Sequence, residues 1–282
     1  MKQGDTYTNE WGIVWQRTGY YNEMIEHPLA NISTVSELDD IDFMSHLDEG
    51  RFEGIEKQVM RHSEDHATIV EGLSMFESAW FLRGFERFMK DLLGNERFAL
   101  RLIDKVQDFF LKLAKRLLEF DIDMILASDD VGMEKNMLIS PVVWRKVFKP
   151  RWEKMFRELR KKKSDLIICY HTCGHVTPII PDLIDVGVDV LNPIQPRAMD
   201  PAVLKEEFGE RLAFWGTVDE QRVLPFGTVA DVEREVKLRV ETVGMGGGLI
   251  LAPSHNIQPD TSLENIIAFY RASRKYGSYD GD

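Results

Sequence analysis

The sequence predicts an α/β protein, a (β/α)8 barrel in which parallel strands alternate with helices. From Thr68 onward, short apolar runs alternate with longer segments of helical period. This alternation is typical of βα units around a parallel sheet. Polar motifs follow almost every apolar run. Because the active site of such a barrel is built from the loops after its strands, these two observations together favour the barrel.

A doubly wound open sheet is the competing architecture. That fold normally carries a Gly-rich phosphate-binding turn after its first strand, and none follows the first apolar run here. The run Gly246-Gly247-Gly248 precedes an apolar run instead of opening a helix. We therefore expect it to form a tight turn.

The apolar runs predict six strands. They cover residues 68–72, 124–128, 166–170, 188–191, 212–215 and 249–252. The segments of helical period predict helices at residues 76–93, 95–120, 141–162, 176–186, 201–207 and 228–243. Gly94, Gly187 and Gly244 follow three of these segments, at the position where glycine commonly ends a helix.

The chain before residue 68 has a different character. The run WGIVW at residues 11–15 predicts a short strand or hairpin arm, and an acidic, loop-rich stretch covers residues 37–49. We therefore expect an N-terminal approach segment with a short hairpin at residues 1–67 and a barrel domain at residues 68–282.

Charge and composition exclude several classes of partner. The 282 residues include 35 Lys and Arg against 47 Asp and Glu, a net charge of −12. This charge disfavours binding to nucleic acid or to an anionic membrane, and no window approaches the ~18 apolar residues of a membrane span. Cys169 and Cys173 lie roughly 13 Å apart in an extended strand and cannot form a disulfide. We expect a cytoplasmic protein with a small-molecule substrate.

The stretch Cys169-Tyr170-His171-Thr172-Cys173-Gly174-His175 lies where a predicted strand ends. Successive side chains of a strand alternate between faces, so His171 and Cys173 point the same way. Imidazole nitrogen and thiolate sulfur are zinc donors, and a catalytic zinc takes three protein ligands. These two residues therefore predict part of a metal site. Cys169 is flanked by apolar residues and is expected in the core, and His175 is expected to cap a helix or face solvent.

Polar motifs occur in a definite order along the chain. They are Asp129-Asp130-Val131-Gly132 with Ile139-Ser140-Pro141, His171-Thr172-Cys173-Gly174, GVDVLNPIQ at 187–195, Gly216-Thr217-Val218-Asp219, and GGLILAPSHN at 247–256 leading to Glu264-Asn265. Over residues 68–277, this order and spacing resemble the uroporphyrinogen decarboxylase superfamily. The motifs are most similar to its zinc-dependent methyltransferases, which move methyl groups between corrinoid proteins and coenzyme M.

The resemblance implies a TIM barrel of the uroporphyrinogen decarboxylase type in which the six strands are the last six. The first two βα units are then lacking, and two sheet edges are open. Open edges invite pairing, so we expect residues 1–60 or a partner subunit to cover them. A homo-oligomer is the simplest such arrangement.

The resemblance also implies a complete ligand set. In the methyltransferase branch a Cys after the last strand joins the His-x-Cys pair, and the matching position here is His255. The implied zinc ligands are His171, Cys173 and His255. The implied corrinoid, a methylcobamide, would be carried by a separate partner protein, because no corrinoid-binding domain is fused to this chain.

Further polar residues at strand ends are candidates for catalysis or substrate binding. Adjacent side chains face opposite ways, so only one of Asp129 and Asp130 is expected to enter the barrel mouth. There it could orient a zinc-bound His as a hydrogen-bond acceptor, take a substrate proton or bind a cationic group. Glu71, after the preceding strand, could act similarly. Asp219 with Gln221 also fits an ordinary helix N-cap. The candidate substrate-binding residues are Asn192, Gln195, Asp219 and Asn256.

Three functions compete. The first is a zinc-dependent methyltransferase acting between a corrinoid carrier and a small thiol or similar acceptor. The second is a decarboxylase of a tetrapyrrole acid, which the net charge of −12 and the lack of an Arg-Gln-Ala-Gly-Arg-type motif argue against. The third is a non-catalytic subunit that binds a corrinoid or porphyrin.

Overall fold

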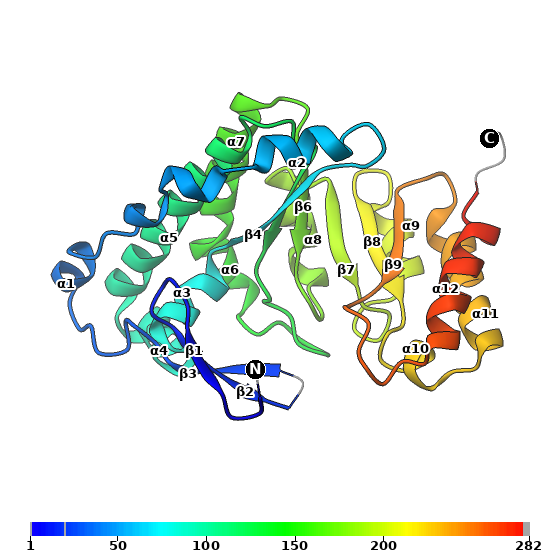
Figure 1. Cartoon of the computed structure of the whole chain (residues 1–282), viewed down its shortest axis with the longest axis horizontal. Coiled ribbons are helices and arrows are strands. Elements are labelled where there is room, and N and C mark those ends of the chain that lie inside the picture. Colours follow the sequence, from blue (N-terminus) through cyan, green and yellow to red (C-terminus); the bar gives the residue numbers. More distant parts are fainter. Residues whose placement is uncertain (1, 20, 279–282) are drawn as a thin grey trace. The chain divides into compact units, whose positions relative to one another are not determined.

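The computed structural model describes residues 2–19 and 21–278. The chain forms two compact units (Figure 1). Unit 1 comprises Met1–Met124 and Pro150–Leu166, and unit 2 comprises Ile125–Lys149 and Ile167–Asp282. The N-terminal segment falls in unit 1 together with a long helix that comes later in the chain, and it packs on that helix.

Unit 1 begins with a small antiparallel sheet. Its strands β1 (Thr6–Thr8), β2 (Val14–Thr18) and β3 (Tyr21–Glu26) pair in sequence order. The run predicted as a hairpin arm enters this sheet at Val14, where β2 starts. Trp11, just before it, turns toward the helices instead and meets the ring of Phe109 edge to face at 4.9 Å.

Helices form the rest of unit 1, together with one strand. The elements are α1 (Val35–Asp39), η1 (Met44–His46), η2 (Glu49–Phe52), α2 (Ile55–His62), β4 (Ile69–Ser74), α3 (Phe76–Arg83), α4 (Phe85–Gly94), α5 (Glu96–Leu117) and most of α7 (Lys149–Lys162). The ion pairs Arg101–Asp39 and Arg116–Glu49 connect α5 to the N-terminal segment. These pairs are partly exposed, so the packed rings contribute more to this contact than the charges do.

Unit 2 holds strands in sequence order, each beside the next. They are β5 (Met124–Ser128), β6 (Ile167–His171), β7 (Val190–Ile194), β8 (Ala213–Val218) and β9 (Leu249–Pro253). β6 to β9 are paired in parallel. The helices are α6 (Pro141–Val147), η3 (Thr177–Ile179), α8 (Ile180–Asp185), α9 (Pro201–Phe208), α10 (Val223–Phe226), α11 (Val229–Arg239), η4 (Val240–Gly244) and α12 (Leu263–Tyr276).

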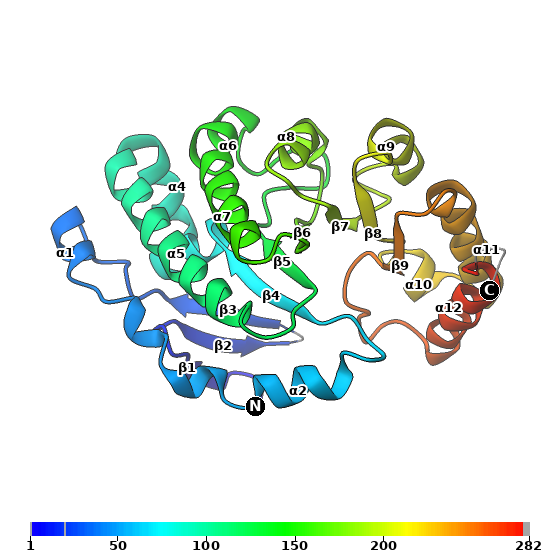
Figure 2. The ribbon, with the colours of Figure 1, turned by 90° about the horizontal axis from the view of Figure 1, so that it is seen from above.

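The core of unit 2 lies between these strands and their helices. Figure 2 shows α8 and α9 on one face of the sheet. Ile168, Cys169 and Tyr170 of β6 are fully buried, which anchors the end of β6 firmly before the polar motif begins. Each such apolar side chain contributes roughly 1.5–3 kcal/mol on burial. Among the described residues, no helix combines the length and apolar character needed to cross a membrane.

The observed elements differ from the predicted ones at several places, among them α2 and α10, which were not predicted. The predicted helix at 76–93 is two helices separated at Gly84, and the one at 141–162 is two helices separated at Phe148. α12 was not predicted, although Ser262 accepts a hydrogen bond from the backbone N–H of Asn265 as an N-cap residue does. The six strands β4 to β9 lie within three residues of their predicted bounds.

Gly84 gives a test of the break between α3 and α4. Its φ is +86°, and an added Cβ would lie 3.2 Å from the ring of His27. We expect Gly84→Ala to lower the free energy of unfolding by about 1–3 kcal/mol. Gly94→Ala is the matched control, because open space surrounds that position, and it should be neutral or slightly stabilising. Urea unfolding measures both, and equal midpoints for the two variants would contradict the prediction.

Candidate metal centre

The two aspartates after β5 differ in burial and in the hydrogen bonds they make. Asp129 is fully buried, and its backbone N–H donates to the carbonyl of His171 at 3.0 Å. Asp130 is half-buried, and its Oδ1 accepts a hydrogen bond from the backbone N–H of Cys173 at 2.8 Å. Thus Asp130 turns its carboxylate toward the loop after β6.

His171 is the last residue of β6 and lies in register with Asn192 of β7. Its Nδ1 is 2.5 Å from the amide oxygen of Asn192. An amide oxygen can only accept, so Nδ1 carries the ring proton and donates it to this bond. In the neutral imidazole the other nitrogen, Nε2, then keeps its lone pair. Asn192 therefore sets the tautomer that a metal ligand needs.

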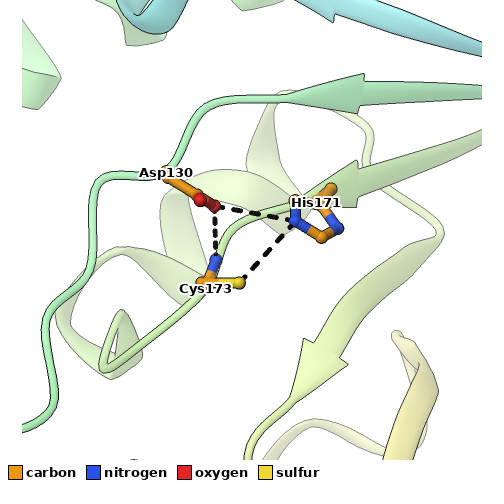
Figure 3. A group of neighbouring side chains, drawn as sticks. All are labelled: Asp130, His171 and Cys173. Carbon is orange, nitrogen blue, oxygen red and sulfur yellow. Dashed lines mark hydrogen bonds and ion pairs between the residues drawn. The ribbon is translucent and has the colours of Figure 1, made fainter. Parts of the chain in front are cut away.

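Nε2 of His171 faces two further donor atoms. It lies 3.8 Å from the sulfur of Cys173 and 3.6 Å from Oδ1 of Asp130. Figure 3 shows the three side chains converging from the loop after β5 and the end of β6. One ligand atom from each of the three lies within 4.8 Å of the other two.

This donor set fits zinc. Donors bound at about 2.0–2.3 Å to one tetrahedral ion lie roughly 3.3–3.8 Å apart. The two distances from His171 Nε2, 3.6 and 3.8 Å, fall in that range. Nitrogen, sulfur and carboxylate oxygen are all zinc donors. Three protein ligands would leave a fourth position for water or a substrate atom.

His255, the predicted third ligand, does not join this group. It is exposed after β9, where its Nδ1 lies 3.4 Å from the carbonyl oxygen of Asn256. Within the described part of the chain, Asp130 is the residue that completes a group of three with His171 and Cys173. The reason is topological. β9 is three strands from β6, or roughly 14 Å at about 4.8 Å per strand.

The other predicted residues are distributed over several roles. Gln195 Oε1 accepts the backbone N–H of Gly174 at 2.7 Å and so supports the loop of the metal site. Asp219 Oδ1 accepts the backbone N–H groups of Gln221 and Arg222, which is the local capping that the sequence also allowed. Asn256 is exposed. Glu71 belongs to unit 1, where it lines a separate pocket.

Two glycines that sequence reasoning missed bring the two loops together. A Cβ on Gly132 would lie 2.3 Å from the carbonyl oxygen of Cys173, and one on Gly174 would lie 2.6 Å from the backbone of Gly132. The backbone N–H of His175 also donates to the carbonyl of Met133 at 2.7 Å. Only glycine allows this approach. The sequence signal that could have identified these two glycines is their position directly after the polar motifs.

A small pocket adjoins Cys173. It has a volume of about 220 Å³, and its charged and amide side chains are Glu134, Arg197, Gln195 and Gln221. Arg197 Nη1 lies 3.7 Å from Oδ2 of Asp219, so its guanidinium is held in place. The arrangement can receive a small polar molecule beside the sulfur of Cys173.

The two cysteines differ in chemistry. Burial raises the pKa of the Cys169 thiol far above its usual range, so this residue stays neutral in the core, as the sequence predicted. Cys173 is half-exposed and faces His171. His175, whose Nδ1 lies 3.1 Å from the carbonyl of Ala198, braces the loop and takes no place in the group of three.

Comparison with known proteins decides the family. Residues 23–276 match the model of the family described as "Uroporphyrinogen decarboxylase (URO-D)". The chain belongs to the uroporphyrinogen decarboxylase family. The match starts well before residue 68, where the resemblance based on sequence motifs begins. It therefore includes most of the N-terminal segment. The family assignment and the α/β fold, a partial TIM barrel of this type, are thereby confirmed.

Individual relatives add detail. The chain is 27% identical over 189 residues to "Methylcobamide:CoM methyltransferase MtaA" of Methanosarcina barkeri, a match that covers 67% of this chain and 52% of the relative. The same protein from strain Fusaro / DSM 804 is 25% identical over the same length. A solved "methyltransferase from Methanosarcina mazei" superposes with a TM-score of 0.69 at 23% identity, covering 91% of this chain and 73% of that one. The chain thus matches about half the length of its curated relatives.

Gly132 gives a test of the contact between the loops. We expect Gly132→Ala to push the loops after β5 and β6 apart and to weaken zinc binding about 10- to 100-fold, the usual cost of disturbing groups that hold metal ligands. Competition with a chelating dye measures the affinity. Gly244→Ala is the control, because its added Cβ meets no atom closer than 3.5 Å. Unchanged affinity in Gly132→Ala would contradict the prediction.

Proposed function

We propose that this protein is a zinc-dependent methyltransferase that moves a methyl group between a corrinoid carrier and a small thiol. The observation that carries the proposal is the convergence of His171 Nε2, Cys173 Sγ and a carboxylate oxygen of Asp130 on one small volume. The methylcobamide:CoM methyltransferases among its relatives support the reaction type. The corrinoid would be carried by a separate protein.

The residues of the site have distinct roles in this proposal. His171, Cys173 and Asp130 would hold the zinc ion, and Asn192 would keep the imidazole in the required tautomer. When bound, zinc lowers the pKa of a coordinating thiol, so that the acceptor is a thiolate at neutral pH. In the reaction, the acceptor thiol loses its proton and gains the methyl group that the corrinoid carrier gives up.

The pocket beside Cys173 supports a small acceptor. Its volume of about 220 Å³ is below the roughly 300–1,000 Å³ of sites for drug-sized ligands. Gln195 is engaged with the loop through its oxygen, so Arg197 and Gln221 are the side chains placed to contact a polar group on the acceptor. The acceptor sulfur would lie toward Cys173, and its polar end toward Arg197.

Zinc content and methyl transfer test the proposal together. We expect about one zinc per chain, and methyl transfer from methylcobalamin, used as a free corrinoid, to 2-mercaptoethanesulfonate. His171→Ala and Cys173→Ser should each lose both properties. Cys169→Ala, which removes the buried sulfur outside the site, should keep both.

Two results would contradict the proposal. One is the absence of bound zinc from protein that was prepared with zinc available. The other is full zinc retention in both His171→Ala and Cys173→Ser. Turnover of uroporphyrinogen by the metal-free protein would replace the proposal with decarboxylation, since that reaction needs no metal donor set.

A further inference from the structure

Unit 1 contains a pocket of its own, of about 330 Å³. Every lining residue lies between Asn9 and Leu113, hence within unit 1. Its floor is apolar, because Ile13, Phe43 and Phe109 are each less than 5% exposed. The volume is at the lower end of the roughly 300–1,000 Å³ typical of ligand sites, so the pocket suits a small molecule.

Aromatic rings dominate the wall of this pocket. They are Trp11, Phe43, Phe81, Phe109 and Phe110. Trp11 meets Phe43 and Phe109 edge to face, with ring centroids 5.6 and 4.9 Å apart. Phe109 in turn meets Phe110 at 5.3 Å. The rings therefore hold one another in fixed orientations, and the wall is formed before any ligand binds.

The charged side chains that line the pocket include more negative than positive groups. They are Glu10, Arg51 and Glu71. Glu10 forms an ion pair with Arg51, which leaves the carboxylate of Glu71 without an opposing charge from the described residues. Glu71 and its neighbour Gly72 are exposed, so this carboxylate lies at the mouth of the pocket.

We propose that this pocket binds a small organic cation, an ammonium group with an apolar body. The apolar wall would receive the alkyl groups, and Glu71 would supply the opposite charge at the mouth. A neutral molecule of the same shape would gain the apolar contacts only. This assignment gives Glu71 a binding role that is independent of the metal centre in unit 2.

A matched pair of ligands tests the proposal. Choline and 3,3-dimethylbutan-1-ol have the same shape, and only choline is charged. Calorimetric titration should show one choline site per chain and at least roughly tenfold weaker binding of the neutral alcohol. The experiment uses the full chain, with and without a chelator. Binding should not depend on the metal, so the result stands whether or not the proposed methyl transfer does.

Three variants assign the binding to this pocket. Glu71→Gln should weaken choline at least about fivefold and leave the alcohol unchanged, and Phe110→Leu should weaken both. Glu86→Gln removes the same charge from an exposed helix position that pairs with Lys90, and it should change neither. Equal affinity for choline and the alcohol, no choline binding, or unchanged choline binding in Glu71→Gln would each overturn the proposal.

Discussion

The candidate metal centre depends on one close contact between backbones, that of the loop after β5 with the loop after β6. Gly132 and Gly174 face each other so closely that neither can carry a Cβ. Because the loops touch, Oδ1 of Asp130 can accept the N–H of Cys173, and the carboxylate comes within 3.6 Å of His171. Without this contact, the fold would present a His–Cys pair and a distant aspartate.

Pairing between neighbouring strands of the parallel sheet positions the other residues around the candidate metal centre. Register between β6 and β7 places Asn192 beside His171, so one cross-strand pair fixes the imidazole tautomer. The carbonyl of Asn192 also accepts the N–H of Thr172 at 2.7 Å, and Gln195 holds the N–H of Gly174. Asn192 and Gln195, which the sequence predicted to bind substrate, thus position His171 and the loop that carries Cys173.

The sequence predicted local features well and non-local features poorly. Strand periodicity located the six strands, and strand alternation predicted that His171 and Cys173 point the same way, because both depend only on neighbouring residues. β6 ends at His171, and Nε2 of His171 still lies 3.8 Å from the sulfur of Cys173. The third member of the group depends on which loops meet in space. A closed barrel would bring the loop after β9, with His255, across the mouth. In this sheet, the loop after β5 is the neighbour, and its glycine contact is not visible in strand periodicity.

The visible spectrum of the Co²⁺-substituted protein tests most directly whether Asp130 completes the group with His171 and Cys173. The intensity and position of the cobalt bands report coordination number and donor type. We expect a thiolate-to-cobalt charge-transfer band that Cys173→Ser abolishes, visible bands that shift in Asp130→Asn, and an unchanged spectrum in His255→Ala. An unchanged spectrum in Asp130→Asn together with shifted bands in His255→Ala would contradict it.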